Sequence, residues 1–428
     1  MKKVEEIREK ANYCLDCKIK PCSINGCPLG NDIPSFIKAV KEEDYRKAYG
    51  VLSKTTVLLG VCGRICPHMK QCQGSCIRGI KGKPVSIGDI EAFVFDKAQE
   101  EKINLKEVFV DSKLSLKSKK VAVIGGGPAG LTCSAFLAKE GVSVTIFEKH
   151  NYLGGILNHG IPEFRLSKEI TKKSIDEILQ LGIDVKFNKE LGKNLDIKDL
   201  ENAYDAIFLS FGANISSKMN IEGEELIGVY GGNELLENKN HPEYKGKIAC
   251  VIGGGNVAID CARTIKKMGA KEVNVIYRRA KSQMPAEEKE VKEAKEDGIN
   301  FLFQNNIVKI EGNKKVESIK LVRTELIEKE GETRKIPVNI ENSNYKIKSD
   351  YVIMALGANP EQNVIKNLGI DTNKYGNIKI DDKYRTSNKK IYAGGDLAGI
   401  KGTVAWASKT GREAAKSIIE DFDIDIKL

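Results

Sequence analysis

Short runs of apolar, β-branched residues alternate with segments of helical length over most of the chain, starting near residue 119. The run Val121–Ile124 predicts a buried parallel strand, and the next run, SVTIFE, ends at Glu148. The same order of strand, helix and strand returns at IACVIGGGNVA (248–258), DCARTIKKMG and VNVIY. Strands that alternate with helices predict an α/β fold with parallel sheets.

The first part of the chain follows a different pattern. Between Ile33 and Leu59, apolar residues recur at helical spacing, and a proline stands near the start of this segment. We therefore expect a small α-helical domain over residues 1–112. The polar stretch SKLSLKSKK (112–120) then connects it to the first strand.

A glycine pattern, Gly125-x-Gly127-x-x-Gly130, follows the first strand and opens the next helix, as in dinucleotide-binding turns. The first glycine permits the tight turn, the second lets backbone N–H groups approach a pyrophosphate, and the third lets helix and sheet pack closely. Glu148 stands where an acid would accept a hydrogen bond from a ribose hydroxyl. An ordinary glycine-rich turn is the weaker interpretation. We expect the first dinucleotide to contact Gly125, Gly127, Pro128, Ala129, Gly130 and Glu148.

The pattern repeats at Gly253-x-Gly255-x-x-Ala258, so the chain predicts two Rossmann-like nucleotide-binding domains. Aligned on the first unit, the second places Arg278 where Glu148 stood, with Arg279 beside it. Replacing the ribose acid by guanidinium groups favours a 2′-phosphate, hence NADP(H) over NAD(H). Ordinary surface arginines are the alternative. The residues expected at this second site are Gly253, Gly254, Gly255, Asn256, Val257, Arg278 and Arg279.

Two later strands, in DYVIMALGANP (350–360) and IYAGGDLAG (391–399), mirror AIFLSFG (206–212) and are expected to return the chain to the first nucleotide domain. The GGD of the second resembles the place where a flavin's ribityl and phosphate groups are held. A long helix follows, and its N-terminus would stabilise a reduced, anionic flavin. The loop HNYLGGILNHGIPEFRLSKE should close over the cofactor. Further cofactor-binding residues are expected at Gly155, Arg165, Gly212, Gly357, Gly395, Asp396, Thr403 and Val404.

These segments predict that the second nucleotide domain is inserted in the first. We expect an FAD-binding domain over 119–230 and 350–428, and an NAD(P)-binding domain over 231–349.

Eight of the eleven cysteines fall in the first 76 residues, with spacings C-x2-C-x4-C-x4-C-P and C-x3-C-P-x4-C-x3-C. Short-spaced runs of this kind hold iron–sulfur clusters, and the last cysteine of a run can ligate a different cluster. Structural zinc favours paired CxxC knuckles, and only Cys14 and Cys17 fit that spacing. Disulfides are disfavoured because no signal peptide appears. Two [4Fe–4S] clusters are therefore the favoured interpretation.

Composition narrows the function classes further. The 428 residues are 41% apolar and 30% charged, and no apolar run is long enough to span a membrane. The charged N-terminus predicts a cytoplasmic protein. A net charge of +10 comes from lysines interspersed with acids, without a nucleic-acid motif, so neither nucleic acid nor membrane is expected as a partner. An acidic electron-carrier protein would be attracted to such a surface.

These motifs together resemble the glutamate synthase small subunit family over nearly the whole chain. Relatives include the N-terminal half of dihydropyrimidine dehydrogenase, its bacterial flavoprotein subunit, and the large subunit of NADH-dependent ferredoxin:NADP oxidoreductase. The matching segments are CLDCKIKPC, GCPLGNDIP, VCGRICPHMKQCQGSC, SIGDIEAF, GGGPAG, GGILNHGIPEFRL, GGGNVAIDCAR, YRRAKSQMPA and AGGD.

The resemblance implies which residues hold the clusters. One cluster would be held by Cys14, Cys17, Cys22 and Cys76. The other would be held by Cys27, Cys66, Cys72 and Glu91. Cys62 would then be a spare thiol, although spacing alone would also allow it as the fourth ligand.

The resemblance also implies a function. NAD(P)H, with NADPH favoured, would deliver a hydride to FAD, and electrons would leave singly through two clusters to a partner subunit or a ferredoxin-like carrier in a hetero-oligomer. No catalytic acid or base is needed for hydride transfer. The segment VLLGVCGR is closer to the dihydropyrimidine dehydrogenase and ferredoxin:NADP members of the family. Two alternative functions therefore stay open: a subunit of a bacterial dihydropyrimidine dehydrogenase, or a subunit of a bifurcating ferredoxin:NADP oxidoreductase. A zinc-stabilised, non-catalytic NADP(H) sensor is the alternative from another class.

Overall fold

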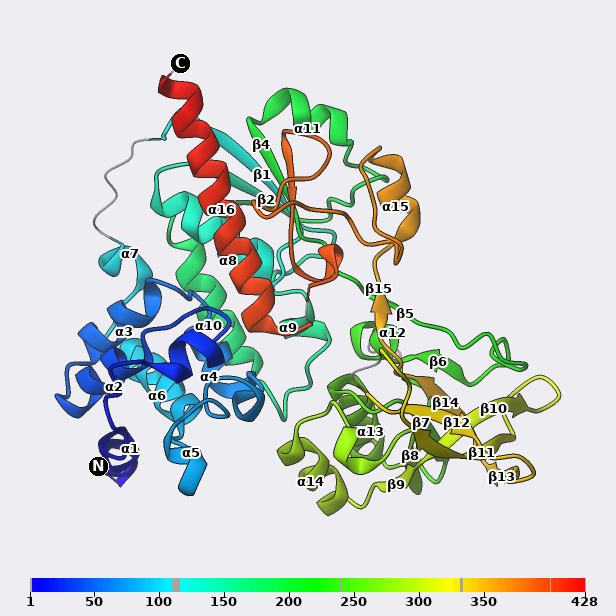
Figure 1. The fold of residues 1–428 in the computed structure, drawn as a ribbon. Coiled ribbons are helices and arrows are strands. Elements are labelled where there is room, and N and C mark those ends of the chain that lie inside the picture. The colour runs from blue at the N-terminus through cyan, green and yellow to red at the C-terminus, as the bar shows by residue number, and fades with distance from the viewer. Residues whose placement is uncertain (1, 110–115, 239–240, 332–333, 401, 428) are drawn as a thin grey trace. The chain divides into compact units, whose positions relative to one another are not determined.

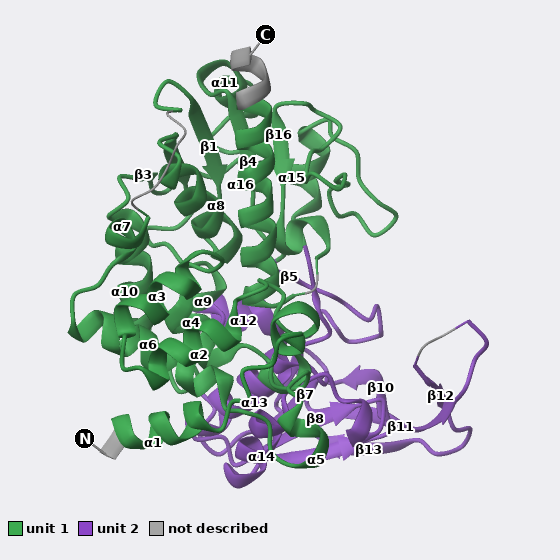
Figure 2. Ribbon diagram, turned by 60° about the vertical axis from the view of Figure 1, so that its left-hand side comes forward, with its two compact units in different colours: residues 1–158, 163–213, 360–428 green, residues 159–162, 214–359 purple. Residues whose placement is uncertain are grey.

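The computed structural model describes residues 2–109, 116–238, 241–331, 334–400 and 402–427. The chain forms two compact units, coloured separately in Figure 2. Unit 1 contains residues 1–158, 163–213 and 360–428, and unit 2 contains residues 159–162 and 214–359. Within the described ranges, no helix is both long enough and apolar enough to cross a membrane.

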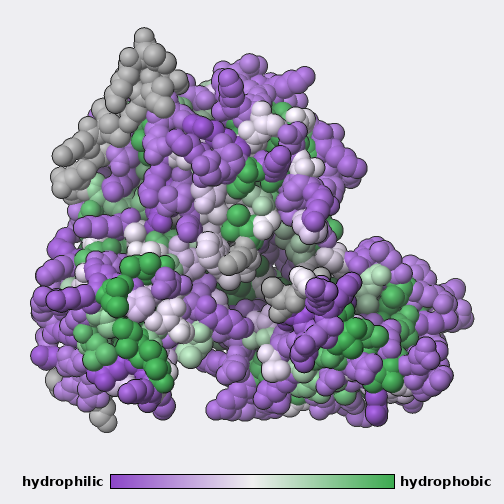
Figure 3. Space-filling model, viewed as in Figure 1, coloured by the Kyte–Doolittle hydropathy of each residue, from purple (hydrophilic) through white to green (hydrophobic). Residues whose placement is uncertain are grey.

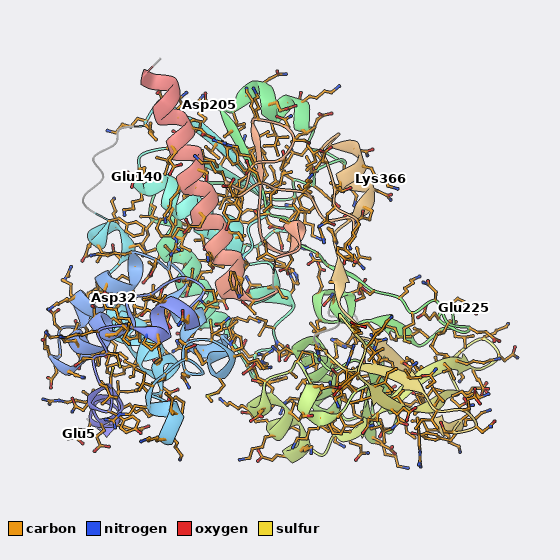
Figure 4. The ribbon with its side chains drawn as sticks, viewed as in Figure 1. Glu5, Asp32, Glu140, Asp205, Glu225 and Lys366 are labelled. Atoms are coloured by element: carbon orange, nitrogen blue, oxygen red, sulfur yellow. The ribbon has the colours of Figure 1, made fainter. Side chains whose placement is uncertain are left out.

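Short helices and loops form the N-terminal part of unit 1, as predicted (Figure 1). They are α1 (Lys2–Asn12), η1 (Cys22–Gly26), α2 (Ile33–Lys41), α3 (Tyr45–Ser53), α4 (Leu59–Ile65), η2 (His68–Lys70), α5 (Arg78–Lys81), α6 (Ile87–Glu100) and α7 (Leu105–Val108). Asp32, labelled in Figure 4, caps α2 by accepting a hydrogen bond from the Ser35 backbone N–H. The expected end of this domain and the first part of the connection after it fall on residues 110–115, outside the described residues.

A five-stranded parallel sheet forms the rest of unit 1, with the order β16-β4-β1-β2-β3. Its strands are β1 (Lys120–Ile124), β2 (Ser143–Phe147), β3 (Asp184–Lys186), β4 (Ala206–Leu209) and β16 (Ile391–Ala393). Its helices are α8 (Pro128–Lys139), α9 (Ile156–His159), α10 (Lys168–Leu179), α11 (Ile197–Ala203), α15 (Gln362–Asn367), η4 (Gly395–Ala398) and α16 (Val404–Lys427). Figure 1 shows α8 and α16 side by side, and a Cβ at Gly411 would lie only 2.1 Å from the Ala129 carbonyl oxygen. The two helices therefore pack unusually closely there.

Unit 2 contains a second five-stranded parallel sheet, with the order β6-β14-β7-β8-β9. Its strands are β6 (Val229–Gly231), β7 (Ile248–Ile252), β8 (Glu272–Tyr277), β9 (Asn300–Phe303) and β14 (Tyr351–Met354). Its helices are α12 (Gly232–Asn238), α13 (Asn256–Lys267), η3 (Lys281–Gln283) and α14 (Glu288–Glu296). The α/β prediction with two parallel sheets is thus confirmed.

Unit 2 also contains antiparallel strands that the sequence analysis did not predict. They are β10 (Asn305–Glu311), β11 (Ser318–Ile327), β12 (Ile336–Asn339) and β13 (Tyr345–Lys348), together with a short ribbon of β5 (Ile215–Ser216) and β15 (Ala358–Asn359). Ile307, Ile319 and Leu321 are buried within a core cluster that also includes residues of β7 and β14.

One expectation about the domain order is wrong. The strand of segment 350–360 does not return the chain to the first nucleotide domain, because β14 pairs in parallel with β7 of the second sheet. The strand near residue 230 also belongs there, since β6 pairs with β14. The chain leaves unit 1 after Ala213 and returns at Pro360.

Candidate functional site

The first glycine turn has the geometry that a pyrophosphate requires. Gly125 has a positive φ of 101°, and a Cβ there would lie 2.7 Å from the Ser210 carbonyl oxygen. A Cβ at Gly130 would lie 2.0 Å from the Gly125 carbonyl oxygen, so the helix approaches the turn closely. At Gly127, by contrast, a Cβ would meet no described heavy atom within 4 Å. The open space lies at the N-terminus of α8, which begins with Pro128 and Ala129 and favours an anion.

Glu148 follows β2 directly and is 5% exposed. Its Oε2 accepts a 2.8 Å hydrogen bond from the Gly126 backbone N–H, and its Oε1 accepts one of 2.9 Å from the His150 N–H. The carboxylate is therefore fixed beside the glycine turn. The next loop also returns to this turn, since a Cβ at Gly155 would lie 3.2 Å from the Gly127 Cα.

The segment after β16 also reaches the first turn. Gly395 has a φ of 67°, and a Cβ there would lie 3.3 Å from the Ala129 Cβ. Burial raises the pKa of Asp396 to about 6. Thr403 caps α16 by accepting a 3.3 Å hydrogen bond from the Trp406 N–H, and Val404 is the first helical residue. Four of the expected flavin contacts thus come from the segment that follows β16.

The remaining expected cofactor contacts do not all belong to unit 1. Arg165 is half-buried in unit 1, and Gly212 there has a positive φ of 75°. Gly357, with a φ of 123°, belongs to unit 2.

The second glycine turn repeats the geometry of the first. Gly253 has a φ of 146°, and a Cβ there would lie 2.1 Å from the Ala355 carbonyl oxygen. Gly254 lies against the Tyr277 ring, while a Cβ at Gly255 would meet no described heavy atom within 4 Å. Helix α13 begins at Asn256, followed by Val257, and Asn256 Oδ1 accepts a hydrogen bond from the Glu287 N–H. This N-terminus fits a second phosphate group.

An arginine that the sequence analysis missed lies near Arg278 and Arg279 at the end of β8. Arg278 is exposed and Arg279 half-buried. Arg334, which precedes β12, donates hydrogen bonds to the Tyr277 hydroxyl at 3.4 Å and to the Gln283 carbonyl. The Arg279 Nε also donates to the Lys335 carbonyl at 3.4 Å. The turn before β12 therefore brings a third guanidinium group to the end of β8.

Four cysteines that are spread over 63 residues of the sequence line one pocket among the N-terminal helices. They are Cys14, Cys17, Cys22 and Cys76. Most of the other lining residues are apolar, including Ile37 and Ile87. Burial raises the pKa of Cys22 to about 11, and the neighbouring thiols Cys14 and Cys76 add to the shift. Four soft sulfur donors in an apolar setting fit an iron–sulfur cluster, whose binding requires thiolates.

A second group surrounds Glu91, which lies on α6 and is 5% exposed. Its Oε1 has no hydrogen-bond partner among the described residues, and burial raises its pKa to about 8. Burial also raises the pKa values of Cys27 and Cys72, with the Glu91 carboxylate adding to both shifts. An unpartnered buried carboxylate is costly, and a cationic centre among these thiols would satisfy it.

Cys62 and Cys66 belong to the same group. A hydrogen bond with Cys62, followed by burial, raises the pKa of Cys66 well above its ordinary value. Helices α4 and α6 approach closely beside Cys62 and Glu91, because a Cβ at Gly63 would lie 2.5 Å from the Ala92 backbone N. The thiol and the carboxylate are therefore both available to a group bound here.

Two buried charged side chains form hydrogen bonds between the cysteine-bearing helices and the rest of unit 1, and neither was anticipated. Arg412, on α16, is 6% exposed and donates hydrogen bonds to the carbonyls of Leu29 at 2.7 Å and Thr55 at 2.9 Å. Glu177, on α10, accepts hydrogen bonds from Tyr49 and Gln99. The sequence signal for the Arg412 contact is an arginine at an otherwise apolar position of the helix pattern.

Comparisons with known proteins agree with this geometry. Residues 119–414 match the family model described as pyridine nucleotide-disulphide oxidoreductase. Residues 1–103 match the family model described as dihydropyrimidine dehydrogenase domain II, 4Fe-4S cluster.

Two relatives and one solved structure illustrate the similarity. The glutamate synthase [NADPH] small chain of Escherichia coli is 35% identical over 98% of this chain and 92% of that protein. The NADP(+)-dependent formate dehydrogenase subunit beta of Moorella thermoacetica is 34% identical over 93% of this chain and 59% of that protein. FprA of Mycobacterium tuberculosis in complex with NADPH, at 19% identity, has a TM-score of 0.63 over 72% of this chain and 85% of that chain, a likeness of fold.

The family model covers well over half of the chain, and the bacterial small chain matches it almost from end to end. The chain therefore belongs to the pyridine nucleotide-disulphide oxidoreductase family, in the group that includes the glutamate synthase small chains.

Proposed function

We propose that this protein is an electron-input subunit that oxidises NADPH at a bound FAD and passes electrons through two [4Fe–4S] clusters to a partner. The observation that carries the proposal is the junction inside unit 1. Helix α16 packs at Gly411 against Ala129 at the start of α8, and its Arg412 contacts the loop that contains Cys27. When bound, FAD accepts two electrons together from the nicotinamide and releases them one at a time to the clusters.

Unit 1 residues would hold the flavin. Gly125, Gly127 and Gly130 leave room for the pyrophosphate at the start of α8, and Glu148 is fixed where it can bind the ribose. Asp396 would contact the ribityl chain. The N-terminus of α16, capped by Thr403, would present its partial positive charge to the isoalloxazine ring. The other expected contacts in unit 1 remain Pro128, Ala129, Gly155, Arg165, Gly212, Gly395 and Val404, and the expected contact Gly357 belongs to unit 2.

Unit 2 residues would hold NADPH. The open space at Gly255 and the start of α13 would take the pyrophosphate, together with Gly253, Gly254, Asn256 and Val257. Arg278, Arg279 and Arg334 would bind the 2′-phosphate, because guanidinium groups form strong hydrogen bonds with phosphate. The names of both relatives above contain NADP, which supports NADPH over NADH.

Two sets of N-terminal residues would hold the clusters. Cys14, Cys17, Cys22 and Cys76 would hold one cluster. Cys27, Cys66, Cys72 and Glu91 would hold the other, with Cys62 as the alternative fourth ligand. A carboxylate is a harder donor than a thiolate and would shift the reduction potential of its cluster.

Disulfide reduction is not the proposed chemistry, although the family description includes it. That reaction needs a pair of redox cysteines. The three cysteines beyond residue 76 are Cys133 on α8, Cys250 on β7 and Cys261 on α13, and each is fully buried and free. Burial raises the pKa of each thiol, which makes it a poor nucleophile.

The acceptor is proposed to be a separate subunit or carrier protein. The relatives named above are a small chain of glutamate synthase and a beta subunit of formate dehydrogenase, so chains of this kind work within larger oxidoreductases. We propose a cytoplasmic hetero-oligomer, where thiols stay reduced and NADPH is available.

The test uses protein purified anaerobically. We expect bound flavin, iron and acid-labile sulfide, and stopped-flow bleaching of the flavin absorbance that is faster with NADPH than with NADH. Zinc without sulfide would instead support a non-catalytic sensor. Faster bleaching with NADH would remove the proposed role of the three arginines while leaving the electron-input function in place.

A further inference from the structure

Exposed aliphatic residues stand close in the sequence to the cysteines of the pocket lined by Cys14, Cys17, Cys22 and Cys76. Leu15 is 50% exposed, Ile19 75%, Ile24 72% and Ile80 77%. Each stands within four residues of one of the pocket cysteines. We call these four residues the apolar rim. Figure 3 shows hydrophobic residues gathered on the face formed by the N-terminal helices. Single exposed aliphatics are ordinary, but a group of them marks an interaction surface.

The rim is held in place by the segments that carry it. The Arg78 guanidinium lies 4.2 Å from the centre of the Tyr13 ring, and its Nε donates a 2.9 Å hydrogen bond to the Tyr13 carbonyl. Arg78 also lines the pocket, together with Leu15. The segment before Cys14 and helix α5, which carries Ile80, therefore form one continuous surface.

The charge around the rim has one sign. No Asp or Glu occurs between Thr55 and Gly88. The nearby acids are neutralised, since Asp16 pairs with Lys41, Asp32 with Lys20 and Asp89 with Lys10, each at 2.8 Å. Three further lysines are exposed, namely Lys18, Lys81 and Lys83. None of them takes part in an ion pair found among the described residues. The apolar rim is thus bordered by uncompensated positive charge.

We propose that the apolar rim is the docking site of a small acidic electron-carrier protein, which presents an apolar contact area bordered by carboxylates. This proposal rests on the proposed function, and it adds the place on the protein surface where electrons pass to the carrier. Complementary charge speeds encounter, and the aliphatic contact excludes water over the cysteine pocket. A few exposed aliphatics form a small interface, which is typical of transient electron-transfer complexes.

The overall step balances simply. One NADPH supplies a hydride, which carries two electrons. Two carrier molecules each take up one electron at the rim, and NADP⁺ and one proton are released.

The test measures reduction of a plant-type [2Fe–2S] ferredoxin, used as an acidic probe, by NADPH through the holoprotein. Ferricyanide serves as a small acceptor that needs no docking surface. We expect Ile24→Glu and Ile80→Glu to lower kcat/KM for ferredoxin about tenfold each, while iron content, flavin bleaching and ferricyanide reduction stay unchanged. Tyr375→Glu, at an equally exposed position (70%) elsewhere in unit 1, should change nothing.

Lys81→Glu should also lower kcat/KM for ferredoxin and weaken its dependence on salt. Three outcomes would overturn the proposal. The rim variants could reduce ferredoxin at the wild-type rate, or the wild type could reduce basic cytochrome c faster than ferredoxin. A rim variant could also change only the oligomeric state, turning a dimer of this chain into a monomer. If the wild type did not reduce ferricyanide with NADPH, that result would instead contradict the proposed function itself.

Discussion

Tyr49 donates a 2.7 Å hydrogen bond from its hydroxyl to Glu177 Oε2, joining helix α3 to helix α10 in the interior of unit 1. Gln99 on α6 donates to the other carboxylate oxygen. Burial raises the pKa of Glu177 to about 7, and the two hydrogen bonds only partly offset this. The native state therefore binds the carboxyl proton of Glu177 more tightly than the unfolded chain does.

The sign of the pH effect follows from that difference. A raised carboxyl pKa stabilises the fold fully below about pH 4.5, and the stabilisation is lost as the pH rises to about 7. Glu177→Gln resembles the protonated form at every pH and should not lose this stabilisation. At pH 8 its free energy of unfolding should therefore exceed that of the wild type by up to about 3 kcal/mol. We expect a higher Tm than the wild type at pH 8 and an equal Tm at pH 4.5.

The matched control is Glu169→Gln, an exposed carboxylate at the start of the same helix. It should show no such pH-dependent difference. Equal Tm differences for Glu177→Gln at both pH values would show that the carboxyl is not protonated in the native state.

Arg412 should be needed to keep the Cys27 loop in place. Arg412→Gln leaves the buried carbonyls of Leu29 and Thr55 without their donor, at a cost of about 1–3 kcal/mol. We expect a lower Tm and less iron per chain, with Arg412→Lys partly restoring both. Lys416→Gln, exposed on the same helix, is the control. Full iron content in Arg412→Gln would show that the loop does not depend on this contact.

Glu91 and Cys62 can be distinguished by spectroscopy. If Glu91 completes the second cluster, Glu91→Ala should change the electron paramagnetic resonance spectrum of one reduced cluster and leave the other intact. Cys62→Ser should then leave both spectra unchanged. The reverse result would assign the ligand role to Cys62.

Arg334 should contribute to the choice between NADPH and NADH. Arg334→Met removes one guanidinium group from the proposed 2′-phosphate site and should raise KM for NADPH about tenfold, which corresponds to about 1.4 kcal/mol. KM for NADH should not change. Arg323→Met, also exposed in unit 2, is the control. Equal effects on both nucleotides would place Arg334 outside the phosphate site.

Much of the fold could be predicted because local patterns determine it. Both glycine turns fall between a strand and a helix as expected, and the positive φ angles of Gly125 and Gly253 explain why glycine is required there. The helical N-terminal region followed equally from the spacing of its apolar residues.

The rest depends on contacts between distant segments. Arg334 is 56 residues from Arg278, and only the pairing of β11 with β12 brings it to the end of β8. Segment 350–360 looks like a buried parallel strand whichever sheet contains it, so its apolar pattern could not show that β14 pairs with β7. The carboxyl of Glu177 likewise gives no local sign that Tyr49 faces it.

The antiparallel pair β5 and β15 has a consequence for how such proteins are assembled. Ile215 lies opposite Asn359, so the two ends of unit 2 are neighbours, although more than 140 residues separate them. A module with adjacent ends can be inserted into a loop, or removed and replaced by a short linker, without altering the strand order of its host. If unit 2 binds NADPH as proposed, it could be exchanged for another nucleotide-binding unit without changing the residues proposed to hold the clusters.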